Sequence, residues 1–215
     1  MKKTLIPGLL LIFVFATGCD WHRIRGNGNI TTEQRSITAF TKVEVGGACE
    51  LKWRPGAPSL GLTTDQNLLP RIETEVTSDT LRIKTHGPLA PTHGIKIVIS
   101  SQNLTGAQLS GAVRFDAAQL SEAEFILDTS GATKVLLDGK ATQLVASLTG
   151  ASELRAGSLQ TDSTEISVTG AGRAEVAVAS SLKASITGAG KVTYLGNPKS
   201  VQKEITGAGK IERRP

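Results

Sequence analysis

The sequence predicts an all-β protein, a parallel β-helix or β-solenoid built from coils of 18–20 residues. A Ser/Thr-Gly-Ala unit occurs six times, and successive glycines are 20, 19, 20, 18 and 19 residues apart. Apolar and polar residues alternate in the segments between these units, and no window keeps a helical period over three turns. A period that contains strands and no helix is typical of a solenoid, whose coils bury their inner faces by stacking. A sandwich or barrel is the alternative, but it gives no reason for so regular a period.

The first 18 residues are predicted to be a lipoprotein signal peptide rather than part of the fold. Lys2 and Lys3 precede an apolar run over residues 5–15, which is too short for a spanning helix of about 20 residues. The small residues that precede Cys19 resemble a lipobox, with Ala16 in place of the usual leucine. We therefore expect cleavage before Cys19 and lipidation of that residue. A conventional signal peptide cleaved near the same point is the alternative.

The rest of the chain divides into a short anchor segment and one domain. Residues 19–39 are polar and are expected to form a lipid-anchored tether, and residues 40–215 to form a single β-solenoid domain with its clearest repeats at 105–215. Loss of the signal peptide lowers the formal net charge from +5 to +3, which does not favour a nucleic-acid partner. We expect an exported cell-envelope protein held to a membrane by its lipid. Asp20 favours the inner membrane over the outer one without deciding between them.

The repeat glycines set the frame of each coil. In a strand, residues at even distances from a glycine share one face, and here these residues are mainly apolar with Thr as the commonest substitute. The glycine is expected to allow a sharp corner or a close approach to the next coil, and the alanine to stack on its neighbours. The segment VGGACELKW fits the frame as a degenerate early copy. The repeat glycines are Gly47, Gly111, Gly131, Gly150, Gly170, Gly188 and Gly207.

Cys49 falls on the inward side of this early copy. If Cys19 carries lipid, Cys49 is the only remaining thiol and no intramolecular disulfide can form. We interpret Cys49 as a small buried hydrophobic residue rather than as a reactive thiol.

Several segments resemble one bacterial envelope family. They are GNGNITTEQRSITAFTKVEVGG, TTDQNLLPRIETEV, TSDTLRIKT and the serial Gly-Ala units up to GAGKVTYLGNP and ITGAGKI. The combination is similar to the family described as putative auto-transporter adhesin, head GIN domain, over about residues 26–211. The resemblance implies a right-handed parallel β-helix in an exported protein, in many members a lipoprotein. It implies no catalytic or ligand-binding residue for this chain.

The sequence offers little sign of catalysis, of a metal or of a cofactor. His86 and His93 flank a short loop, but no third ligand has a characteristic spacing, so we expect a solvated loop. A polysaccharide-active β-helix enzyme is the alternative function, and its acids would come from Asp116, Asp128, Asp138 and Asp162. These residues do not recur at one position of the repeat. We therefore expect a non-enzymatic protein that uses its solenoid surface for adhesion or for binding, or serves a purely structural role in the envelope.

One charged pattern suggests a binding surface. Three residues after the repeat glycines stand Arg114, Lys134, Glu153, Arg173, Lys191 and Lys210, five of which are basic. Stacking would align them as a ladder with rungs about 4.8 Å apart. The functional hypothesis is that this ladder contacts an anionic surface, an envelope polymer or an acidic protein. The favoured interpretation is a solvated face that discourages edge pairing, and Asp116, Glu175 and Glu212 two positions further on would partly neutralise the ladder. The sequence specifies no oligomeric state.

Overall fold

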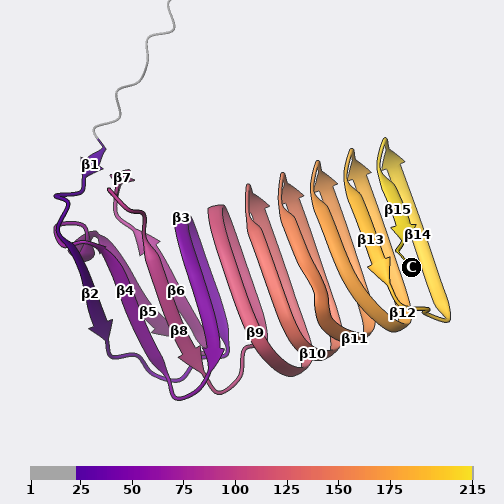
Figure 1. Cartoon of the computed structure of the whole chain (residues 1–215), viewed down its shortest axis with the longest axis horizontal. Coiled ribbons are helices and arrows are strands. Elements are labelled where there is room, and N and C mark those ends of the chain that lie inside the picture. Colours follow the sequence, from indigo (N-terminus) through magenta and orange to yellow (C-terminus); the bar gives the residue numbers. More distant parts are fainter. Residues whose placement is uncertain (1–22, 215) are drawn as a thin grey trace, which may run out of the picture.

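The structure, a computed structural model, describes residues 23–214. A short N-terminal part of mixed strands leads into a stack of parallel coils (Figure 1). The N-terminal part contains β1 (Ile24–Arg25), β2 (Ile30–Arg35), β4 (Ser59–Asp65), the 3-10 turn η1 (Leu69–Arg71), β5 (Ile72–Thr77), β6 (Thr80–Thr85), β7 (Leu89–Ala90) and β8 (Lys96–Ser101). The coils contain β3 (Lys42–Pro55), β9 (Gly106–Gly131), β10 (Lys134–Gly150), β11 (Glu153–Gly170), β12 (Arg173–Gly188), β13 (Lys191–Leu195), β14 (Ser200–Gly207) and β15 (Lys210–Arg213).

The coils stack in the order that the repeat predicts. β3, β9, β10, β11 and β12 pair in parallel with one another in sequence order, β13 and β14 both pair with β12, and β15 pairs with β13. Gly47 lies opposite Gly111, so the segment VGGACELKW is a first copy of the repeat. The prediction of a β-solenoid is therefore confirmed, with about five turns and coils of about 20 residues. The right-handed winding stays a prediction.

The even positions of the frame form the core. All six residues that lie four positions after a repeat glycine are buried, from Phe115 to Ile211. In β11 the inward residues fall in three runs, and each break between runs marks a corner of the coil. The runs are Leu154 and Ala156, then Leu159 and Thr161, and then Thr164, Ile166 and Val168. The β11 coil therefore has three short sides around an apolar interior, whereas in β12 the buried Ala174, Val176 and Val178 form one unbroken run.

The repeat glycines meet both requirements that the sequence suggests. From Gly111 to Gly207 they have φ between 92° and 119°, a region that side chains with a β-carbon rarely adopt. A β-carbon on any of them would also lie within 2.7 Å of the carbonyl oxygen of the glycine one coil earlier. The alanines of the motif do not stack inside the coil, because residues such as Ala151 are exposed. Their amides instead join the coils, and that of Ala151 donates to the Gly131 carbonyl at 2.8 Å.

The described fold begins inside the segment expected to be a tether. β2 pairs with β4 and β1 pairs with β7, so residues 24–35 belong to the sheets. Asp65 holds this segment in place, because its buried carboxylate accepts hydrogen bonds from the amides of Gly28 and Thr92 and from the Thr92 hydroxyl. The expected signal peptide and Cys19 lie outside the described residues. Within residues 23–214, no helix is long and apolar enough to cross a membrane.

The C-terminal end of the stack is an open edge. β14 pairs only with β12 in the described part of the chain, and all eight of its residues are exposed. Val201 and Ile205 occupy inward columns but stay 37% and 44% exposed, because no further coil covers them. Lys203 stands opposite Ala184, in a column that is otherwise apolar. Its ammonium group turns back toward the Ile211 carbonyl, at 3.3 Å, and the ring of Tyr194.

Candidate functional site

The charged residues three positions after the repeat glycines form a continuous row. Strand pairing places Arg114 opposite Lys134, Lys134 opposite Glu153, and Glu153 opposite Arg173. The row continues through Lys191 to Lys210, and at its other end it is extended by Glu50 and Lys96. The charged residues are therefore aligned in one row, as the sequence predicts. Whether they can bind a partner depends on which of them form ion pairs within the chain.

Two rungs share one carboxylate at the C-terminal end. Glu212 forms ion pairs with Lys191, at 2.5 Å, and with Lys210. The hydrogen bonds from these two lysines, Lys191 first, lower the pKa of Glu212 to about 2. The carboxylate therefore keeps its charge at any physiological pH, and it cancels part of the charge of both cations. Of the three acids expected to neutralise the ladder, only Glu212 pairs with ladder residues, whereas Asp116 pairs with Arg54 and Glu175 with Arg214.

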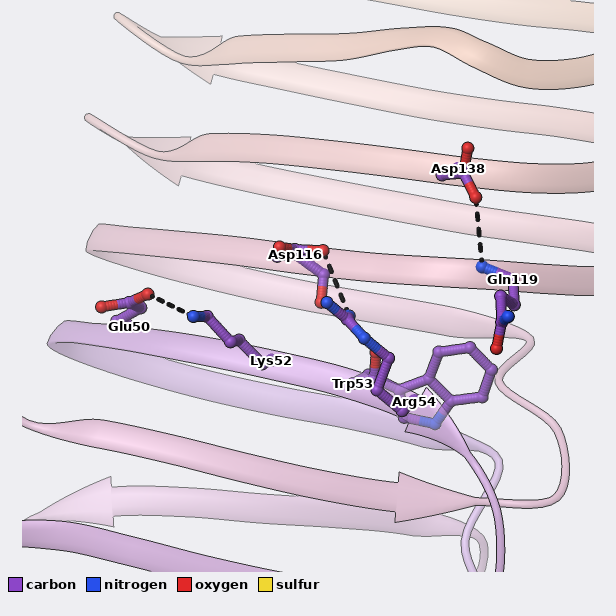
Figure 2. Close-up of polar contacts among 7 residues, drawn as sticks. All are labelled: Glu50, Lys52, Trp53, Arg54, Asp116, Gln119 and Asp138. Carbon is purple, nitrogen blue, oxygen red and sulfur yellow. Dashed lines mark hydrogen bonds and ion pairs between the residues drawn. The ribbon is translucent and has the colours of Figure 1, made fainter.

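The charged side chains of β3 next to the ladder also form ion pairs with neighbouring residues. Figure 2 shows the ammonium group of Lys52 directed toward Glu50 and the guanidinium of Arg54 reaching across to Asp116 on the next coil. The same Arg54 nitrogen donates to the carbonyl of Trp53 at 2.6 Å, which fixes the guanidinium close to the backbone. Glu153 likewise pairs with Arg155 at 2.7 Å.

Three ladder cations make no ion pair among residues 23–214: Arg114, Lys134 and Arg173. Arg114 and Lys134 are adjacent rungs beside a shallow hollow of about 330 Å³. Leu136, at the rim of this hollow, is 45% exposed. We call Arg114, Lys134 and Arg173 the free cations. Arg114, Lys134 and Leu136 give this hollow both charge and apolar contact area, whereas Arg173 lies two rungs from Lys134 with Glu153 between them.

The other residues considered from the sequence do not come together. Cys49 packs against the core, and burial raises the pKa of its thiol to about 11. The His86 Nε2 atom lies 3.0 Å from Glu73, whereas the His93 Nδ1 atom lies 3.1 Å from the Thr92 hydroxyl. No group of three or more His, Cys, Asp or Glu side chains within residues 23–214 could hold a metal ion.

The acidic residues of the alternative enzyme hypothesis are separated in the same way. Asp116 lies opposite Leu136, Asp128 opposite Ser147, and Asp138 opposite Ser158. Asp138 accepts a hydrogen bond from the backbone amide of Gln119 at 3.4 Å, as Figure 2 shows. Strand pairing therefore brings no two of Asp116, Asp128 and Asp138 into one column, whereas Asp162 lines a different hollow together with Glu122.

Sequence reasoning missed a hollow on a different part of the coils. This hollow is a trough of about 1000 Å³ that crosses β9 to β12 and the turn after β13 where the coils change direction. Ala141, Thr161 and Val178 are buried residues along its course. The 18-residue spacing between Gly170 and Gly188 marks the shortest coil, and Ala177, Val178 and Ala179 of that coil line one part of the trough.

The fold and its surface define a class of protein: a β-solenoid with a partly neutralised basic face and an open trough. The chain belongs to the family described as "Putative auto-transporter adhesin, head GIN domain", whose sequence profile matches residues 39–198. That description implies a location at the cell surface or in the envelope. A comparison with curated proteins found no match.

Solved structures support the same fold. A "putative adhesin" from Bacteroides fragilis superposes with a TM-score of 0.73 at 19% identity, over 89% of this chain and 100% of the other. A "putative lipid binding protein" from Parabacteroides distasonis gives 0.57 at 22% identity, over 90% and 100% of the two chains. A "putative adhesin" from Parabacteroides merdae gives 0.57 at 19% identity, over 90% and 99%. At these identities the likeness concerns the fold alone.

Proposed function

We propose that this protein is a lipid-anchored, non-enzymatic component of the bacterial envelope whose solenoid face binds an anionic partner in an adhesion-like role. The observation that carries the proposal is the row that contains the free cations Arg114, Lys134 and Arg173. Cations without an ion-pair partner are available to a ligand. A ligand of Lys191 or Lys210 would first have to break their ion pairs with Glu212.

The strength of such a surface depends on salt. Exposed charges attract a partner over about 10 Å at 0.1 M ionic strength, and higher salt screens this attraction. Leu136 adds an apolar contact beside Arg114 and Lys134 that salt does not weaken. The partner that fits is therefore an acidic polymer or headgroup layer with some apolar surface, such as lipopolysaccharide or anionic lipid.

The test is charge reversal of the free cations. The triple variant Arg114→Glu, Lys134→Glu, Arg173→Glu should lose binding to phosphatidylglycerol vesicles and to lipopolysaccharide, measured by co-sedimentation at several salt concentrations. The matched control Arg71→Glu, Lys84→Glu, Lys199→Glu changes the net charge equally and should keep binding. Equal loss in both variants, or binding that does not respond to salt, would contradict the proposal.

The anchor and the absence of turnover need separate experiments. The Cys19→Ala substitution should move the protein from the membrane to the soluble periplasmic fraction, as measured by membrane fractionation. Fractionation of the unmodified protein shows which membrane retains it. Incubation with polysaccharides should leave their length unchanged. Shorter products that disappear in variants of Asp116, Asp128, Asp138 or Asp162 would instead support the alternative, a polysaccharide-active enzyme.

A further inference from the structure

We infer that the trough is a second binding site, suited to an extended neutral glycan that lies along the axis of the stack. This inference goes beyond the proposed function, because it concerns a different surface and an uncharged ligand. It rests on the backbone at the trough, on the groups that line the trough, and on the equivalent positions that recur in successive coils.

The backbone changes course at one part of the trough. Between paired residues Ala156–Val176 and Gln160–Ala177, β12 omits the three residues that β11 uses to turn its corner. The Thr161 hydroxyl donates to the carbonyl of Ala177 at 2.7 Å and links the shortened coil to β11. From there the trough continues over β10 and β9, so residues of β9, β10, β11 and β12 all line it.

Small residues keep the depression open. Ala123 and Ala179 line it and are exposed, and Ala177 is half-buried. The floor contains buried Ala141, Thr161 and Val178, so a ligand would meet a narrow apolar strip at the bottom. The volume of about 1000 Å³ is about three times that of the hollow beside the free cations.

The polar groups along the trough are free to bind a ligand. Among residues 23–214, the side chains of Lys140, Gln160, Asp162 and Asn197 make no hydrogen bond or ion pair. They supply both donors and acceptors. Lys140 is accompanied by two acids, Asp162 and Glu122, and Glu122 accepts a hydrogen bond from the amide of Leu104. The mixed charge favours a neutral ligand that both donates and accepts hydrogen bonds, as sugar hydroxyls do.

The lining positions of the trough recur at a regular spacing along the stack, which suits an extended polymer better than a compact molecule. Ser121, Lys140, Gln160 and Ala177 are successive partners in strand pairing, so equivalent positions recur about every 4.8 Å along the stack. A sugar ring in an extended glycan has a similar length. An extended peptide fits less well, because the coil backbones that could pair with it already bond to one another.

The test uses the full chain and neutral glycans of increasing length, namely oligomers of N-acetylglucosamine, β-glucan and mannan, with binding measured by calorimetry. Affinity should rise with length up to about four or five rings, the number that spans the coils at about 4.8 Å each. It should not respond to salt. The triple variant of the free cations should bind these glycans normally, which separates this site from the anionic one.

Two variants of the trough and one control complete the test. Ala179→Trp fills the trough and should weaken glycan binding at least tenfold, whereas Gln160→Ala should weaken it about fivefold through loss of a hydrogen bond. Ala151→Trp places the same side chain on an exposed alanine of another corner and should bind normally. Circular dichroism checks that each variant is folded. Absence of binding to every glycan, affinity independent of length, unchanged binding by Ala179→Trp, or preference for an unstructured peptide would each overturn the inference.

Discussion

The carbonyl oxygen of Gly131 lies 2.6 Å from the point that a β-carbon on Gly150 would occupy. The same oxygen accepts the amide hydrogen of Ala151 at 2.8 Å. One atom therefore both excludes a side chain from the next corner and ties that corner to the stack. The close approach repeats from Gly111 to Gly207, and the amides of Ala132, Ala171 and Ala189 make the same hydrogen bond, so the glycine column can be tested at one representative position.

Gly150→Ala should destabilise the fold by more than about 2 kcal/mol, because strain at positive φ is added to a backbone clash. Gly94→Ala is the matched control, since Gly94 has φ of 78° and nothing within 4 Å of the added carbon. It should cost only about 1 kcal/mol for the left-handed conformation. Urea denaturation of both variants measures the difference. Equal costs would show that close approach of the coils contributes nothing.

Thr133→Val should stabilise the protein by about 1 kcal/mol, because a buried hydroxyl without a partner is costly. The Thr133 Oγ1 atom is buried and has no hydrogen-bond partner within residues 23–214. Val113 lies two residues after its repeat glycine, as Thr133 does, and is likewise buried, so the repeat already holds a valine at this position. Thermal unfolding should show a higher Tm than in the unmodified chain. A lower Tm would mean that the hydroxyl has a partner, such as a water molecule.

Asp65→Asn should weaken the attachment of the first strands in a pH-dependent way. Burial alone raises the pKa of Asp65, but the hydrogen bonds from Thr92 and Gly28 outweigh it and lower the pKa. A lowered folded-state pKa contributes stability above the unfolded value of about 4, and this stability is lost as the pH falls through the folded-state value. The variant should therefore be less stable at pH 7 and nearly equal to the unmodified chain at acid pH.

The comparison for Asp65 is Asp128→Asn, which changes an exposed carboxylate. Urea denaturation from pH 7 down to pH 3 should show a stability gap that closes for Asp65→Asn and no comparable gap for Asp128→Asn. A constant gap at every pH would mean that the charge of Asp65 is not what holds Gly28 and Thr92.

Lys203→Ala should promote self-association at the open end of the stack. Lys203 interrupts an apolar column and covers Tyr194, and inward-pointing charges of this kind protect a sheet edge from pairing. Without it, Val201 and Ile205 would adjoin a third apolar position along β14. Sedimentation velocity should show concentration-dependent oligomers of Lys203→Ala and not of Lys199→Ala. If Lys203→Ala stays monomeric at all concentrations, residues other than Lys203 protect the open end from self-association.

The sequence alone determined the coil, its frame and its inner face. The Ser/Thr-Gly-Ala period identifies each corner, and alternation about the glycines places residues such as Phe115 and Val135 inside. It also aligns the ladder, because identical coils in parallel register bring equal positions together. These features follow from a local pattern that repeats, so they can be read without knowledge of distant contacts.

Only the tertiary structure decided which surfaces can bind. Whether Lys191 is free depends on Glu212, which lies one coil later, and whether residues 24–35 join the fold depends on the buried Asp65. The trough is lined by residues of four successive strands, β9 to β12, which only the stacked coils bring together. Each of these features depends on differences between neighbouring coils, and their effect appears only when the coils are stacked.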